Sequence, residues 1–425
     1  MKGLKYIICG KLYNGVDAEF KEGWKILVKD DKIAEVGPDI EKPDEAEVID
    51  LSDATVTPGM IDAHMHMDFW DWHTIREEVY TTSEEMKTLA VLKTAQTCLH
   101  RGFTTIRHVG GITSNGFGVL DVRDAINAGK FEGARIKAAA RFMCTAGSHG
   151  DLSQGFARNP QVSRMLQNIR YSCGAGPDFF RNAVREEIKY GSDFIKIMAT
   201  GGFFTPTDNP SQQQLDDSEM EAIITTAHQM GRYVTAHVYS PSEMKKLIKY
   251  GIDGMEHCSL IDEETEQLII DNHVKVVPTF CPYEEAIHYD PVALKDKQPE
   301  FRAKLELYKD RLQECRKRLV NSKIDFGYGT DFVANHMNYD SGYEFKAWME
   351  SGMGTFRTLR AATLRNAEIL QLDDKIGSIE AGKLADISAW KRDLMTDPYA
   401  LLDCAFVMKE GKQYEAEASP DVEGK

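Results

Sequence analysis

Two histidines, His64 and His66, stand two residues apart at the end of an apolar run, in the segment TPGMIDAHMHMD of residues 57–68. In a β-strand every second side chain lies on the same face. Two imidazoles at this spacing can therefore converge on one point and share a metal ion. Two unrelated surface histidines can show the same spacing, so the choice between these interpretations depends on the rest of the chain.

Four more residues able to bind metal lie in strand-like runs or just after them: Lys196 in FIKIM, His237 in YVTAH, His257 in GMEH and Asp331 in IDFGYGTD. Lys196 is the most informative, because a buried ammonium is costly and a desolvated lysine lowers its pKa readily. A neutral amine adds carbon dioxide to give a carbamate, which can bridge two cations. Taken alone, Lys196 also fits an edge residue that reaches water, or a paired core charge.

Together these groups provide four imidazoles, one carboxylate and one carbamate. This set suits two divalent metal ions, and zinc fits the ligand types best. The predicted cofactors are therefore two divalent cations, with carbon dioxide bound as the carbamate on Lys196. The predicted ligands are His64, His66, Lys196, His237, His257 and Asp331. The neighbouring Glu256 should face the side of its strand opposite to His257, because side chains alternate along a strand.

Strand-like runs alternate with helical segments through the middle of the chain. Several helical segments stop at a glycine, which adopts the left-handed conformation at little cost. The pattern predicts an α/β fold with a (β/α)8 TIM barrel, whose active site lies at the C-terminal ends of the strands. An open doubly wound sheet would need a glycine-rich turn where this chain has HMHMD. The expected strands cover residues 56–63, 103–109, 134–142, 193–199, 232–238, 254–258, 274–280 and 324–330.

The two ends of the chain alternate like short β-strands separated by turn residues. Neither end has enough strands to bury a core by itself. We therefore predict one small composite β-sandwich domain built from residues 1–56 and 376–425. The catalytic barrel domain is expected to cover residues 57–375.

Composition excludes several functional classes. The formal net charge of −16 argues against nucleic acid or an anionic membrane as the main partner. No stretch approaches the roughly 18–20 apolar residues needed to span a bilayer. The 8 cysteines show no CxxC spacing, which is typical of buried thiols in a reducing compartment, so we expect a cytoplasmic protein. The expected partners are a small-molecule substrate and further copies of the chain in a homo-oligomer.

Two motifs resemble signatures of the amidohydrolase superfamily. TPGMIDAHMHMD is similar to its strand-one motif, and IGSIEAGKLADISAW to its C-terminal GxxxxGxxAD segment, here ending at Asp386. The resemblance covers nearly the whole chain. In the two-metal subtype it implies that His64, His66 and Asp331 hold the buried ion. His237 and His257 would hold the more exposed one, and carboxylated Lys196 and a hydroxide would bridge them.

A finer resemblance is to the prolidase-like (Xaa-Pro and Xaa-Arg) metal-dependent dipeptidase branch. It rests on residues 194–240 and on SHGD at residues 148–151. The resemblance implies hydrolysis of the C-terminal amide bond in dipeptides or N-acyl amino acids. His149 and Tyr239 would hold the substrate carboxylate or polarise the scissile carbonyl. Asp331 would orient the attacking hydroxide and carry its proton.

The expected substrate mouth departs from that branch, because SHGD replaces GGHGD and FWDWH follows the histidine pair. The aromatic side chains can line the pocket or pack a mouth loop, and the arginines after the third strand can meet the substrate charge or remain solvated. These residues are Phe69, Trp70, Trp72, Arg158, Arg164 and Arg170. A hydrolase of lactams or cyclic amides stays open as an alternative. A deaminase fits less well, because most use one metal and lack the lysine. A non-catalytic scaffold would be expected to have lost a ligand.

Overall fold

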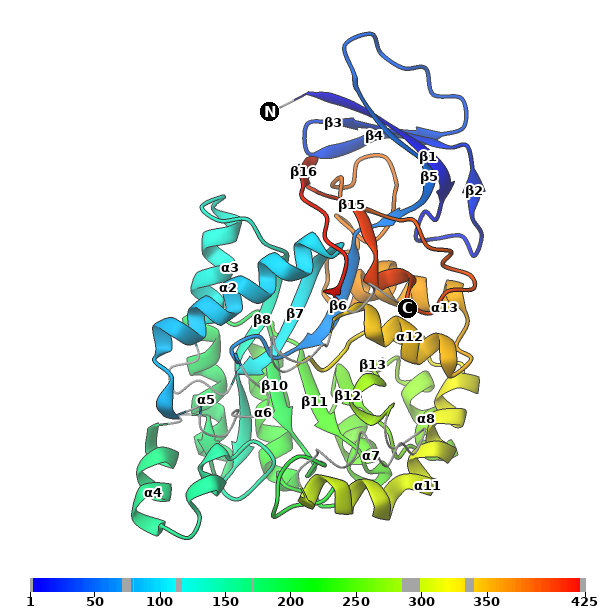
Figure 1. Cartoon of the computed structure of the whole chain (residues 1–425). Helices are drawn as coiled ribbons and strands as arrows, with labels where there is room; N and C mark the ends of the chain where they lie inside the picture. The colour runs from blue at the N-terminus through cyan, green and yellow to red at the C-terminus, as the bar shows by residue number, and fades with distance from the viewer. Residues whose placement is uncertain are drawn as a thin grey trace.

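The computed structural model describes residues 3–70, 78, 80–111, 117–169, 172–284, 299–332 and 340–420. Two sheets organise them: a parallel sheet surrounded by helices, and a mostly antiparallel sheet at one end of it (Figure 1). None of the described helices is both long and apolar enough to cross a lipid bilayer. The 8 cysteines are buried free thiols, as the sequence predicts.

The parallel sheet forms most of a barrel, in which each strand pairs with the next along the chain. Every residue of β6, β7, β10, β11 and β12 is buried, as expected where helices cover one face and the barrel interior the other. The strands are β6 (Met60–Met65), β7 (Phe103–Gly111), β8 (Arg135–Thr145), β10 (Ile195–Met198), β11 (Val234–Val238), β12 (Gly254–His257) and β13 (Lys275–Val277), with β9 (Cys173–Gly174) beside β8.

Residues 324–332 close the barrel between β13 and β6 without forming a continuous strand. Isolated bridges pair Phe326 with β13 and Phe332 with β6. A Cβ atom at Gly329 would lie only 2.7 Å from the Cβ atom of His64, so glycine is what lets this segment approach β6. The predicted (β/α)8 TIM barrel is confirmed, with its eighth strand reduced to two bridges.

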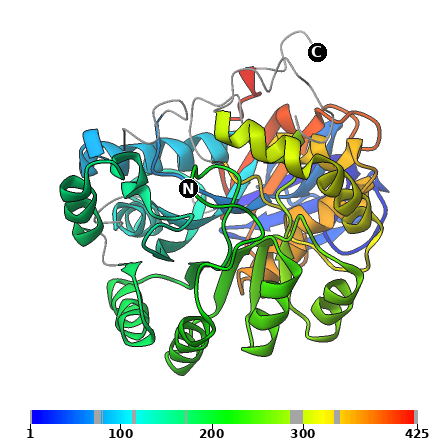
Figure 2. The same cartoon turned by 90° about the horizontal axis from the view of Figure 1, so that it is seen from below.

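Helices cover the outside of the barrel (Figure 2). Glycine ends α5 as predicted, because Gly191 has a left-handed φ of 106°. A capping box begins α6. The side chain of Asp216 accepts a hydrogen bond from the backbone N–H of Glu219, and the Glu219 carboxylate accepts one from the backbone N–H of Asp216. The helices are α2 (Glu84–His100), α3 (Gly118–Asn127), α4 (Pro160–Ile169), α5 (Pro177–Tyr190), α6 (Asp217–Gln229), α7 (Pro241–Lys249), α8 (Glu263–Asp271), α11 (Pro299–Asn321), α12 (Gly342–Glu350), α13 (Thr355–Arg360) and α14 (Asn366–Ile369), with short turns η2 (Leu152–Phe156), η3 (Cys281–Tyr283), η4 (Ala361–Arg365) and η5 (Ala400–Leu402).

The second sheet is built from both ends of the chain and has its own apolar core. Its strands are β1 (Leu4–Leu12), β2 (Lys21–Glu22), β3 (Lys25–Lys29), β4 (Lys32–Gly37), β5 (Glu47–Pro58), β14 (Ile387–Trp390), β15 (Cys404–Lys409) and β16 (Lys412–Tyr414). Antiparallel pairing of β5 with β14 joins the two ends. These pairings support our proposal that residues 1–56 and 376–425 form one domain beside a barrel domain of residues 57–375.

The predicted strand over residues 56–63 is in fact divided at Gly59 between the two sheets. A Cβ atom at Gly59 would lie 2.2 Å from Oγ1 of Thr104, so a larger residue would disturb the contact with β7. The chain therefore passes directly from the terminal sheet into the barrel. The apolar run alone could not show this division, because both halves are buried.

Candidate metal centre and active site

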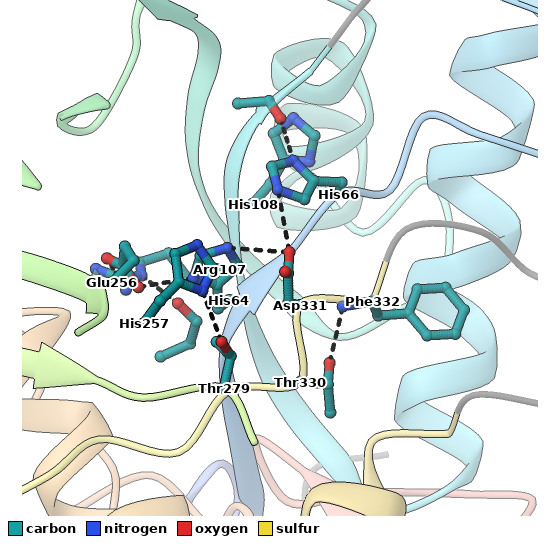
Figure 3. Close-up of polar contacts among 12 residues, drawn as sticks. His64, His66, Arg107, His108, Glu256, His257, Thr279, Thr330, Asp331 and Phe332 are labelled. Atoms are coloured by element: carbon teal, nitrogen blue, oxygen red, sulfur yellow. Dashed lines mark hydrogen bonds and ion pairs between the residues drawn. The ribbon is translucent and has the colours of Figure 1, made fainter. Parts of the chain in front are cut away.

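His64, near the end of β6, and His66, just after it, turn toward Asp331 in the segment that closes the barrel (Figure 3). Their Nε2 atoms lie 3.3 Å and 3.5 Å from Oδ1 of Asp331. Each Nδ1 atom is held from behind, by the carboxylate of Glu256 at 2.7 Å for His64 and by the carbonyl oxygen of Gly110 at 2.6 Å for His66. These contacts orient both Nε2 atoms toward one point, as metal ligation requires.

His237, one residue before the end of β11, and His257, the last residue of β12, extend the same cluster. Their ring centroids are 4.7 Å apart, and the ring of His257 lies 5.0 Å from that of His64. Nδ1 of His257 is 2.7 Å from Oγ1 of Thr279, whereas Nε2 of His237 is 3.3 Å from the carbonyl oxygen of Gly201. Within the described part of the chain, this leaves Nε2 of His257 and Nδ1 of His237 available as ligands.

Lys196 lies on β10, beside β11, and its side chain is buried. Burial lowers the pKa of its ammonium to about 8, although the carboxylates of Glu256 and Asp331 act in the opposite direction. At such a pKa a large fraction of the amine is neutral near pH 8. The lowered pKa therefore favours the neutral amine that carbamate formation needs.

The protonation of the other groups also fits divalent metal ions, whose ligands must be deprotonated. Burial holds the pKa of His237 and of His257 well below the ordinary value, so both rings are neutral. Burial disfavours the charge of Asp331, but His64 and His66 outweigh it and hold its pKa well below the usual range. Nε2 of His64 is buried and, among the described residues, faces Asp331 without a well-formed hydrogen bond. A bound cation would give both Nε2 of His64 and the carboxylate of Asp331 a partner.

Backbone strain is concentrated around this cluster. His257, Cys258, Thr279 and Asp331 adopt positive φ angles of 72°, 53°, 45° and 56°. Such conformations are uncommon outside glycine, and for the β-branched Thr279 they are a true outlier. Strain of this kind persists where the surrounding structure imposes it, and it occurs preferentially at functional sites. Here it turns side chains at the strand ends into the barrel mouth.

The expectation that Glu256 faces the side of its strand opposite to His257 is wrong. Glu256 does not point away from the cluster, because the positive φ of His257 breaks the alternation and both side chains contact His64. The Glu256 carboxylate also accepts hydrogen bonds from Arg107 at 2.7 Å and Thr235 at 2.5 Å. Burial disfavours its charge, but Arg107 and His64 outweigh burial and keep its pKa far below the ordinary range. Glu256 is thus a fixed anion behind a metal-ligand candidate.

Replacing Glu256 by glutamine is expected to weaken zinc binding by about 10–100-fold, the usual cost of losing an anionic partner of a ligating histidine. Zinc affinity is measured by competition with a chromogenic chelator, and thermal unfolding is followed in parallel to detect a loss of fold. Glu264→Gln, at an exposed residue of α8, is the matched control and should leave zinc affinity unchanged. Unchanged affinity in a folded Glu256→Gln protein would refute this role.

The structure places both predicted substrate residues against the histidine cluster. The ring of His149 stacks on that of His237 at 4.4 Å with an interplanar angle of 19°. The ring of Tyr239 stacks on that of His257 at 5.1 Å and 15°. The hydroxyl of Tyr239 contacts that of Tyr283, a buried residue that sequence reasoning missed. Tyr283 ends η3, six residues after the end of β13, and this place beyond a strand end, in FCPY, was the available signal.

The other candidates at the substrate mouth have no described contact with the cluster. Phe69 is buried, and the indole N–H of Trp70 donates to the carbonyl oxygen of Met86, which indicates packing against α2. Arg158, in a turn, and Arg164, on α4, are both exposed, in agreement with solvated positions. Two further candidates lie outside the described residues, Trp72 and Arg170.

Comparison with known proteins agrees with this geometry. Residues 55–414 match the amidohydrolase family. Ochratoxinase of Aspergillus niger is 26% identical over 410 residues, which cover 92% of this chain and 82% of ochratoxinase. The crystal structure of a Xaa-Pro dipeptidase with methionine in its active site is 30% identical, with a TM-score of 0.85 over 97% of this chain and 100% of that one.

A prolidase solved in complex with N-methylphosphonate-L-proline is 25% identical, with a TM-score of 0.81 over 97% of this chain and 100% of that chain. The family match spans the barrel and the C-terminal strands β14 to β16 of the terminal sheet, and it contains every residue of the histidine cluster. The relatives named above include hydrolases of amide bonds, which supports hydrolysis of a carbon–nitrogen bond in general terms. The chain belongs to the amidohydrolase family.

Proposed function

We propose that this protein is a binuclear metal-dependent hydrolase that cleaves the C-terminal amide bond of dipeptides or N-acyl amino acids. The observation that carries this proposal is the convergence of four histidines and Asp331, with the buried Lys196 on the adjacent strand β10 and with His149 and Tyr239 stacked directly against two of those histidines. Similarity to a Xaa-Pro dipeptidase and to ochratoxinase supports the same class of substrate.

Two divalent cations, zinc by ligand type, would be held by this cluster. His64, His66 and Asp331 form one half of the donor set, and their ligand atoms lie within 4.8 Å of one another. His237 and His257 form the other half. The neutral Lys196 amine would add carbon dioxide and release a proton, and the resulting carbamate would supply an anionic ligand to this site. When bound, such cations lower the pKa of water to near neutrality and polarise a carbonyl oxygen.

The residues of the chain supply the proton transfers and the hydrogen bonds. Asp331, kept ionised by its surroundings, would accept a proton from the attacking water and pass it to the leaving nitrogen. Burial and the neighbouring Tyr283 raise the pKa of Tyr239 well above its ordinary value, so its phenol stays protonated. Tyr239 can therefore donate to the oxygen that becomes negative as water attacks. His149 would bind the substrate α-carboxylate.

Amidation of the substrate carboxylate is expected to lower kcat/KM by roughly 10²-fold, since a hydrogen bond to a charged group contributes about 1.5–3 kcal/mol. The measurement compares a library of dipeptides and N-acetyl amino acids with their C-terminal carboxamides, using zinc-loaded enzyme. His149→Ala should give a similar loss on the free acids, and combining the two changes should be less than additive. Equal turnover of acids and carboxamides would contradict the proposal and favour a lactam or cyclic amide hydrolase.

A further inference from the structure

Polar contacts hold the edge of the His149 ring, whose face stacks on His237. The Nδ1 atom of His149 lies 2.8 Å from Oγ1 of Thr205 and 3.3 Å from Oδ2 of Asp208, both in the loop that follows β10. The ring is thus held between a metal-ligand candidate and a polar loop. The orientation of His149 depends on residues that the chemistry proposed above does not use.

Asp208 is the centre of that loop, and its side chain is only 2% exposed. Its Oδ2 atom also accepts a hydrogen bond from the side-chain amide of Gln214 at 3.2 Å. The side-chain oxygen Oε1 of Gln214 accepts a hydrogen bond from the backbone N–H of His149 at 2.8 Å. Asp208 therefore restrains both the ring and the backbone of His149.

Lys304 supplies the counter-charge from α11, which lies along the lower edge of the barrel in Figure 1. Its ammonium donates to Oδ1 of Asp208 at 2.9 Å, to the carbonyl oxygen of Gly202 at 2.8 Å and to that of Thr205. The Lys304 side chain is 11% exposed, so this ion pair is largely removed from water. A buried anion such as Asp208 is strongly destabilised when its partner is lost. Lys304 thus couples the position of α11 to that of the loop.

Gly202 leaves the space that the ring of His149 occupies. A Cβ atom at this position would lie 2.2 Å from Cε1 of His149 and 2.5 Å from its Nδ1. Those atoms belong to a side chain, so alanine at position 202 would displace the ring and not the barrel. The small residue and the charged pair therefore constrain the same imidazole.

We propose that Asp208, Lys304 and Gly202 are positioning residues that hold His149 where it selects substrates with a free carboxylate. This inference rests on the proposed function, because it assigns the carboxylate to His149. It adds that selectivity is set by α11 and the loop after β10, two segments that contribute none of the six metal-ligand candidates. None of the three residues takes part in the chemistry itself.

The test compares Asp208→Asn, Lys304→Met and Gly202→Ala with the wild type. Measured quantities are the ratio of kcat/KM for the best N-acyl amino acid to that for its carboxamide, the zinc content, and the position of the His149 ring in crystal structures. Each variant should lower the ratio about tenfold, mainly through KM of the free acid, as expected when one charged hydrogen bond is displaced. Zinc content should not change, and the ring should leave its place over His237.

Two exposed residues of α11 provide controls, because Asp310→Asn and Lys317→Met make the same chemical changes away from the loop. Both should keep the wild-type ratio. A native ring position and an unchanged ratio in Asp208→Asn and Gly202→Ala would overturn the inference. If the wild type itself does not distinguish acids from carboxamides, the proposed function fails. The ring position in the two variants then decides the positioning role on its own.

Discussion

Replacing Lys196 by alanine is expected to reduce hydrolysis by at least roughly 10³-fold, because the proposed carbamate ligand would be lost and metal catalysis contributes several kcal/mol. Bound zinc should fall from about two equivalents per chain to fewer than one. Millimolar acetate or propionate should restore part of the activity, since a small carboxylate can occupy the place of the carbamate. The measurements are metal analysis of the purified protein and kinetics with and without the added acid.

Lys137→Ala is the matched control for this prediction. Lys137 also lies on a barrel strand, but near the start of β8, where its ammonium pairs with Asp193 at 3.3 Å. This variant should keep zinc and activity, which separates loss of the carbamate from loss of any barrel lysine. A Lys196→Ala enzyme with two zinc ions and wild-type activity would end the hypothesis. So would an electron-density map that shows an unmodified amine at Lys196.

Asp331→Asn is expected to lower kcat by roughly 10²–10⁴-fold, the range that general acid–base catalysis usually contributes. Asparagine keeps the shape and one oxygen ligand, but it cannot accept a proton from water or deliver one to the leaving nitrogen. KM should change less than kcat, because the lost step follows substrate binding. Steady-state kinetics at saturating zinc, with zinc content measured on the same samples, tests this expectation.

The control for Asp331 comes from the same segment. Asp325 precedes the barrel-closing bridges, its side chain is 47% exposed, and it pairs with Arg360 on the outside of the barrel. Asp325→Asn should therefore leave kcat unchanged. Full zinc occupancy together with wild-type kcat in Asp331→Asn would show that another group carries the proton.

The metal-ligand candidates were predictable because strand ends in a TIM barrel meet at one rim. His64 and Asp331 are 267 positions apart, yet each follows a strand-like run, and the barrel brings such positions together. Lys196 could be singled out because an ionisable group within an apolar run needs an explanation. The local pattern and the fold class together were enough for these residues.

Glu256, Tyr283 and Lys304 were not predictable in the same way. Alternation placed Glu256 on the wrong side, because the left-handed backbone at His257 cannot be read from residue types. Tyr283 follows a strand without a distinctive spacing. Lys304 sits on a helix whose sequence reads as an ordinary charged surface, and its buried contacts depend on how α11 packs against the loop after β10.

The sequence by itself determined the fold class, the pairing of the two chain ends and the identity of the metal-ligand candidates. These properties depend on periodicity and on residue type, which are local features of the sequence. Only the tertiary structure decided the division at Gly59, the network around Glu256 and the loop that holds His149. Those features arise from close approaches between segments tens to hundreds of residues apart. Their contact geometry is fixed by packing and backbone strain, and neither leaves a periodic signal in the sequence.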